Sequence, residues 1–81
     1  MIILENTQII EMLKEEGFKK DENQKHNPGV PSIRYINGED SFSVARGRIH
    51  TNSEIVEKLI KNSNIEYTEY VLDEDGSLKR V

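Results

Sequence analysis

Apolar residues recur at three- and four-residue spacing in two segments of the chain, and this spacing predicts two amphipathic helices. The first segment covers residues 6–18, and its apolar stripe consists of Ile9, Ile10, Met12 and Leu13. Gly17 stands where a helix end favours a left-handed residue, and Phe18 can fold back onto the last turn. The second stripe consists of Ile55, Val56, Leu59 and Ile60. Before it, Thr51 and Glu54 have the spacing of a capping box, which predicts the start of the second helix.

Alternating apolar and polar residues predict a β-hairpin between the two helices. Residues 32–36 and 41–45 flank an Asn-Gly turn sequence, which is the strongest short-range hairpin signal. A four-residue connection pairs Tyr35 with Phe42 and Ile33 with Val44, so that all four face the core and Arg34 faces outward. A last hairpin is expected from residues 65–72 and 77–81, with its turn at residues 73–76.

The remaining segments set the fold class. Residues 1–4 can pair as a further strand, and residues 19–31 form a polar loop that a short strand over residues 18–21 would shorten. These elements predict a single α+β domain over residues 1–81, with two helices packed on one face of a four- to five-stranded antiparallel sheet, in the order (β)αββαββ. The opposite face of the sheet is then open to solvent or to a partner. Whether the two αββ halves are a true repeat stays open.

Length and composition exclude several classes of protein. A chain of 81 residues supports one hydrophobic core, and without cysteine it has neither disulfides nor a thiolate zinc site. The apolar run over residues 1–4 stops at Glu5, which is too short for a secretory signal or a membrane span. We therefore expect a cytoplasmic protein with no membrane partner. Ala45 is the only alanine, which favours an AT-rich coding sequence such as those of many low-GC bacteria and their phages.

Residues that could carry catalysis are few. His26 lies in the polar loop and His50 just before the second helix, and neither has the spacing of a metal ligand. No nucleophile elbow, phosphate loop or metalloprotease motif occurs. The acidic turn at residues 73–76 lacks the alternating ligands of a calcium loop. We therefore predict no catalytic residue, no metal and no cofactor, and we favour a protein that is not an enzyme.

The order of elements is similar to that of the HicA-type toxins, which are small RNA-cutting domains with a double-stranded-RNA-binding-like fold. Glu16-Gly17-Phe18, His26, the hairpin over residues 33–44 and the helix over residues 51–62 occupy comparable places, over about two-thirds of the chain. The resemblance implies an RNase that uses a histidine. His26 stands here in Gln24-Lys25-His26-Asn27 rather than in the Gly-Ser-His context of that family, and the family is usually basic.

Charge gives the main functional hint. The chain has fifteen acidic and eleven basic residues, and the net charge of −4 disfavours non-specific binding to DNA or to an anionic membrane. Arg46 and Arg48 nevertheless form a local basic patch with Arg34 nearby on the predicted sheet. Such arginines can bind phosphates or the carboxylates of a partner, or they can pair with glutamates of the protein itself.

These observations favour a small non-enzymatic protein that binds a protein partner, such as a phage or mobile-element inhibitor of a host factor. Its expected partner-binding residues are Arg34, Arg46, Arg48 and Tyr70. Two alternatives remain: a nucleic-acid-binding module that uses Arg34, Arg46 and Arg48, with Tyr35 as a further candidate, and a small HicA-like RNase. Homodimerisation through a sheet edge also stays open.

Overall fold

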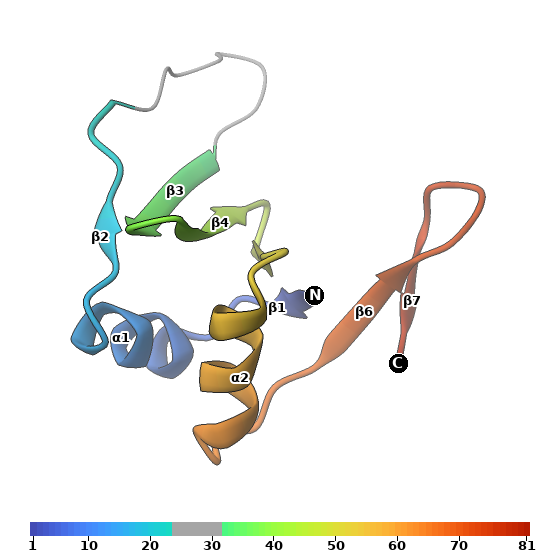
Figure 1. Cartoon of the computed structure of the whole chain (residues 1–81). Helices are drawn as coiled ribbons and strands as arrows, with labels where there is room; N and C mark the ends of the chain where they lie inside the picture. The colour runs from blue at the N-terminus through green and yellow to red at the C-terminus, as the bar shows by residue number, and fades with distance from the viewer. Residues whose placement is uncertain (24–31) are drawn as a thin grey trace.

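The computed structural model describes residues 1–23 and 32–81, and there it has two helices and seven strands (Figure 1). The helices are α1 (Thr7–Glu15) and α2 (Glu54–Asn62). The strands are β1 (Ile2–Leu4), β2 (Lys19–Lys20), β3 (Ser32–Asn37), β4 (Asp40–Ala45), β5 (Arg48–His50), β6 (Glu69–Leu72) and β7 (Leu78–Arg80).

All seven strands form one antiparallel sheet in the order β2-β3-β4-β5-β1-β6-β7. β1 therefore lies inside the sheet, between β5 and β6, although it comes first in the sequence. The two helices pack on the same side of the sheet, and the β6–β7 hairpin projects away from them (Figure 1). The expected α+β fold with two helices and an antiparallel sheet is confirmed.

The register of the strands assigns each residue to one of two faces, because directly paired residues point to the same side. The helix-covered face carries the row Ile33–Val44–Ile49–Ile3, and beside it Tyr35 pairs with Phe42. The pairings expected for the central hairpin are therefore confirmed. The buried core consists of Ile3, Ile9, Leu13, Phe18, Phe42, Ile49, Val56 and Ile60, so both helices and the middle of the sheet contribute to it.

The expected count of four to five strands is wrong. Two short strands account for the difference. β2 lies within the short strand considered over residues 18–21, and β5 has three residues, which is too few to show an alternating pattern. β5 follows a tight turn in which both Arg46 and Gly47 have positive φ, so the chain turns back at once to pair with β4. The last hairpin is shorter than expected, and Ile65 and Tyr67 pack against the core from the segment that leads into β6.

The start of α2 also differs from the expected capping box. Ser53, not Thr51, is the N-cap, and its hydroxyl accepts a hydrogen bond from the Val56 amide over 3.3 Å. Thr51 is buried instead, and its hydroxyl donates to the carbonyl oxygen of Ser41 over 2.8 Å. The helix therefore begins two residues later than the sequence pattern indicates, and Thr51 joins the helix start to the sheet.

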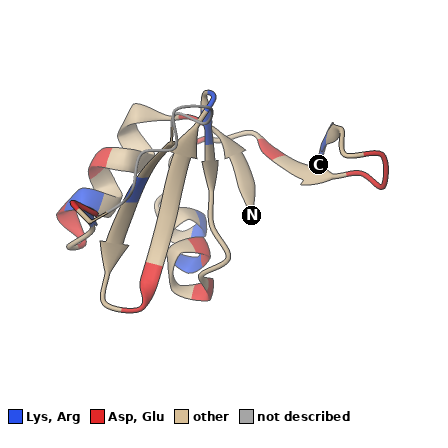
Figure 2. Cartoon of the chain, turned by 90° about the horizontal axis from the view of Figure 1, so that it is seen from above, with Lys and Arg blue, Asp and Glu red and all other residues tan. Residues whose placement is uncertain are grey.

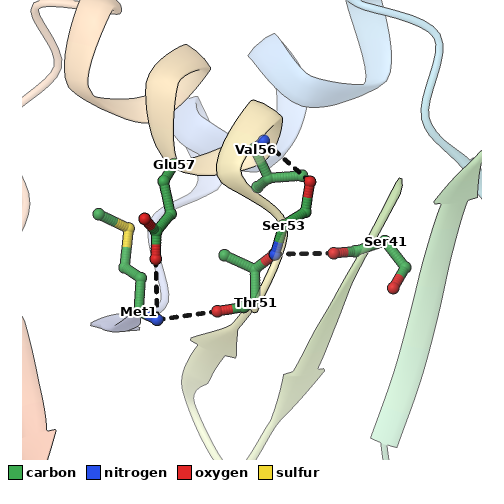
Figure 3. A network of polar contacts seen from close by, with 6 residues as sticks. All are labelled: Met1, Ser41, Thr51, Ser53, Val56 and Glu57. Carbon is green, nitrogen blue, oxygen red and sulfur yellow. Dashed lines mark hydrogen bonds and ion pairs between the residues drawn. The ribbon is translucent and has the colours of Figure 1, made fainter. Parts of the chain in front are cut away.

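A network of polar contacts surrounds this junction (Figure 3). The amino group of Met1 donates to the carbonyl oxygen of Thr51 over 2.8 Å and lies 3.2 Å from the Glu57 carboxylate. The Thr51 amide in turn donates to the carbonyl oxygen of Met1 over 3.0 Å. These contacts join β1, β4 and α2 at one end of the sheet.

Candidate interaction face

The face of the sheet that the helices leave open carries the candidate site. Its longest row of directly paired residues crosses six strands and reads Arg34–Ser43–His50–Ile2–Tyr70–Arg80. A neighbouring row reads Ser32–Ala45–Arg48–Leu4. Lys19, Ile36 and Ser41 lie in line on the same side, as do Leu72 and Leu78 on the last hairpin. We call this set of strand residues the open face.

The open face contains basic residues and no acidic ones. Among its described strand positions, the cations are Lys19, Arg34, Arg48 and Arg80, and none of the positions holds aspartate or glutamate. Acidic residues occur at its margin: Asp21 follows β2, and Glu39 lies in the β3–β4 turn. The excess of acid in the whole chain lies elsewhere, on the helices and at the tip of the β6–β7 hairpin (Figure 2). This asymmetry sets the charge that a partner at the sheet would meet.

Aliphatic side chains are exposed among these cations. Leu4 is 50% exposed and Leu72 is 65% exposed, and Ile2 and Leu78 are half-buried. A contiguous face that mixes exposed aliphatic groups with arginine has the composition found at the centre of protein interfaces.

The structure places three of the four expected partner-binding residues on this face. Arg34 and Tyr70 lie in the same cross-sheet row, separated by Ser43, His50 and Ile2. Arg48 lies in the adjacent row. Arg46 differs because it stands in the β4–β5 turn, where its backbone φ is +54° and its side chain is exposed.

Tyr35, the further aromatic considered for nucleic-acid binding, lies on the other face. Its ring stacks on Phe42 with centroids 4.9 Å apart and planes 9° from parallel. The ammonium group of Lys14 lies 5.6 Å from the centre of the Tyr35 ring. Tyr35 therefore helps to attach α1 to the sheet, and Tyr70 is the aromatic residue that the open face presents among the described strand positions.

A cleft of about 780 Å³ opens at one end of the face. Arg34, His50 and Leu72 contribute to its lining, together with the polar groups near Thr51. A hollow of this size can take one large side chain or a short peptide segment. The lining also contains the acidic residues Glu39 and Asp40, so the cleft carries charges of both signs.

The surroundings of His50, on the open face, lower its pKa. Burial, the nearby Arg48 guanidinium and the Met1 amino group all lower the pKa of His50 below its ordinary value of 6.5. The ring therefore stays neutral at pH 7 and adds no charge to the row. His50 pairs with Ser43 and Ile2 in the middle of the sheet, and its side chain is partly buried there.

The residues that the sequence pattern missed are Ile2, Leu4, Leu72 and Arg80. Their place depends on the strand order, which puts β1 beside β6. This order aligns Ile2 and Arg80 with Arg34 and aligns Leu4 with Arg48, and Leu72 lies on the same face. His26, a candidate for RNase chemistry, lies outside the described residues.

Within residues 1–23 and 32–81, no group of three or more histidine, aspartate or glutamate side chains could hold a metal ion. No helix in those ranges has the length and apolar character needed to cross a bilayer. Comparisons with protein-family models, with curated proteins and with solved structures returned no significant match.

Proposed function

We propose that this protein is a binding module that engages a protein partner through the open face of its sheet. The observation that carries the proposal is that the face combines exposed leucines with arginines and contains no acid among its described strand positions. Burial of Leu4 and Leu72 would provide apolar contact area, and the cations select a partner whose surface is acidic. Tyr70 and Arg48 are residue types that dominate binding energy in such interfaces.

Inhibition of a host factor by a phage or mobile-element protein is the setting that we propose for this binding. Small size and a sequence rich in Ile, Asn, Lys and Glu suit such an origin.

A second candidate function is single-stranded nucleic-acid binding. Arg34 and Arg48, which lie in adjacent rows of the open face, favour it, since a basic surface can follow a phosphate backbone. Against it, base stacking needs aromatic platforms, and the position of Tyr35 leaves Tyr70 alone in that role among the described strand positions of the open face.

Two single substitutions on the face discriminate between these functions. Leu4→Ser removes exposed apolar surface without changing charge, and Arg48→Gln removes charge. Lys61→Gln on the exposed side of α2 is the matched control. A pull-down from host lysate, with and without nuclease, supplies the candidate partners, whose affinity for each purified variant is then measured by calorimetry.

Binding of a protein partner through this face requires both its apolar surface and its positive charge. We expect Leu4→Ser and Arg48→Gln each to lower the affinity for the partner by about tenfold, and Lys61→Gln to leave that affinity unchanged. Loss in Arg48→Gln alone, with a steep dependence on salt and recovery of nucleic acid, would instead establish the second candidate. Equal loss in the α2 control would exclude the open face as the binding surface.

A further inference from the structure

The β6–β7 hairpin exposes apolar side chains on both of its faces. Val71 points to the side of the sheet that the helices occupy, yet it is 51% exposed, so the helices do not reach this part of the sheet. Leu72 on the open face is 65% exposed and Val81 is 73% exposed. Figure 1 shows the hairpin standing clear of both helices. Apolar groups exposed on both sides of a two-stranded arm indicate that the arm is covered by something else.

β7 forms one edge of the sheet, and its outward backbone groups can be identified. The Asp73 amide donates to the Ser77 carbonyl over 2.8 Å, and the Val81 amide donates to the Glu69 carbonyl over 2.9 Å. Hydrogen-bonded and non-hydrogen-bonded pairs alternate along an antiparallel ladder. Leu78 and Arg80, which face Leu72 and Tyr70, therefore direct their N–H and C=O groups away from β6. Such groups are a template for another strand.

Charge along the hairpin has a polarity that matches an antiparallel copy of itself. The tip carries Asp73, Glu74 and Asp75, and the end of β7 carries Lys79 and Arg80 (Figure 2). Two hairpins laid side by side in antiparallel fashion place each acidic tip beside the basic end of the other. A parallel arrangement would place like charges together.

We infer that the β6–β7 hairpin is a homodimerisation arm, and that two copies of this chain join through β7 in antiparallel register centred on Leu78. In that register Leu78 faces Leu78 of the second copy, in line with Leu72 of each copy, and their outward backbone groups exchange hydrogen bonds. The pairing forms one continuous sheet across the two copies and so extends the open face.

The charges beside Leu78 are compatible with the same register. Nζ of Lys79 lies 3.0 Å from Oδ2 of Asp73 within its own hairpin, which reduces the repulsion between Lys79 and a second copy. Centring on Leu78 sets Lys79 opposite Ser77 of the other chain and brings Asp75 of that chain within diagonal reach. The two-fold axis repeats this contact, since the interface is the same patch on both copies.

The first test is sedimentation of the full chain from about 10 µM to about 1 mM, a range suited to an edge-strand contact of small area. We expect a shift from monomer to twice the monomer mass. Leu78→Glu places two carboxylates opposite each other and is expected to abolish the shift. Val71→Glu, on the other face of the same hairpin, is the matched control and is expected to retain it. A monomer throughout, or a dimer that survives Leu78→Glu, would overturn the inference.

A charge exchange tests the register itself. Asp75→Lys and Lys79→Glu each create two like-charge contacts in the proposed dimer, so each variant alone is expected to self-associate at least about tenfold more weakly. Mixed together, the two variants restore both contacts, and a heterodimer is expected at the affinity of the unmodified chain. Folding of each variant is verified by circular dichroism. If the mixture of folded variants fails to associate, the antiparallel register is wrong.

Discussion

The hydroxyl of Thr51 donates a hydrogen bond to the carbonyl oxygen of Ser41 over 2.8 Å, and Thr51 is only 6% exposed. The hydroxyl oxygen of Thr51 also accepts a hydrogen bond from the Ser53 amide over 3.1 Å. One side chain therefore bonds both a carbonyl group of β4 and the amide of the residue that caps α2. In Thr51→Val the side chain keeps its shape, but the Ser41 carbonyl and the Ser53 amide lose their hydrogen-bond partner. We expect it to lower the free energy of unfolding by about 1–3 kcal/mol in urea titration, whereas Thr51→Ser keeps most of the stability. Equal stability of the valine variant would show that the hydrogen bond contributes nothing.

The position of the α2 cap gives a second expectation. Because the Ser53 hydroxyl accepts from the Val56 amide, Ser53→Ala is expected to cost about 1 kcal/mol of stability. Glu54 follows the cap directly and has only a favourable position relative to the helix dipole, so Glu54→Ala is expected to cost a few tenths, about 0.3 kcal/mol. Thermal unfolding of the two variants measures the difference. A Glu54→Ala variant as unstable as Ser53→Ala would instead support the capping box that the sequence predicts.

The end of α1 requires glycine at position 17. Gly17 has φ of +109°, and a Cβ built there would lie 3.1 Å from Nδ2 of Asn37. We expect Gly17→Ala to destabilise the protein by more than about 1 kcal/mol in chemical denaturation. Gly38 is the control: its φ is +62° and a Cβ there would meet nothing within 4 Å. If both substitutions cost the same, the close approach of Asn37 has no energetic effect.

His50 makes stability depend on pH. Burial comes first among the causes that lower its pKa, followed by Arg48 and the Met1 amino group. The folded state therefore binds a proton less readily than the unfolded state does, and its stability is highest above the unfolded pKa of 6.5 and falls as the pH drops below it. Hydrogen bonds from Ser77 lower the pKa of Asp75 from its ordinary value of 3.8. Asp75 therefore changes its charge only at a pH below the range in which His50 does. Urea midpoints between about pH 7 and pH 5 should decline in the parent chain and decline less in His50→Gln. Identical slopes would contradict this assignment.

The sequence predicts those parts of the fold that depend on local patterns. Both helices, the pairing of Tyr35 with Phe42 and the end of α1 at Gly17 follow from spacing, turn residues and caps, and the structure has all of them. β5 was missed because three residues next to a two-residue turn carry no periodic signal. Its position inside the sheet depends on β1, which lies at the start of the sequence and outside any local window.

Local sequence patterns also predict only part of the candidate site. Arg34, Arg48 and Tyr70 could be chosen from composition, because arginine and aromatic residues are common in interfaces. That they share one acid-free face with Leu4 and Leu72 depends on the sheet order, in which residues distant in sequence become neighbours. The net charge of −4 disfavours non-specific binding to DNA or to an anionic membrane, but a total cannot show on which surface the acidic residues lie.

The interior position of β1 has a consequence for how the chain folds. Its neighbours, β5 and β6, are both distant from it in the sequence, and even the Asn6 side chain donates to the Glu66 carbonyl, sixty residues further on. The central hairpin can form early from local contacts, but the sheet is complete only when β6, in the last third of the chain, pairs with β1. Such long loop closures slow folding. Until that step is complete, the apolar side chains of β1 remain without their core, and the newly made protein is then most vulnerable to aggregation and proteolysis.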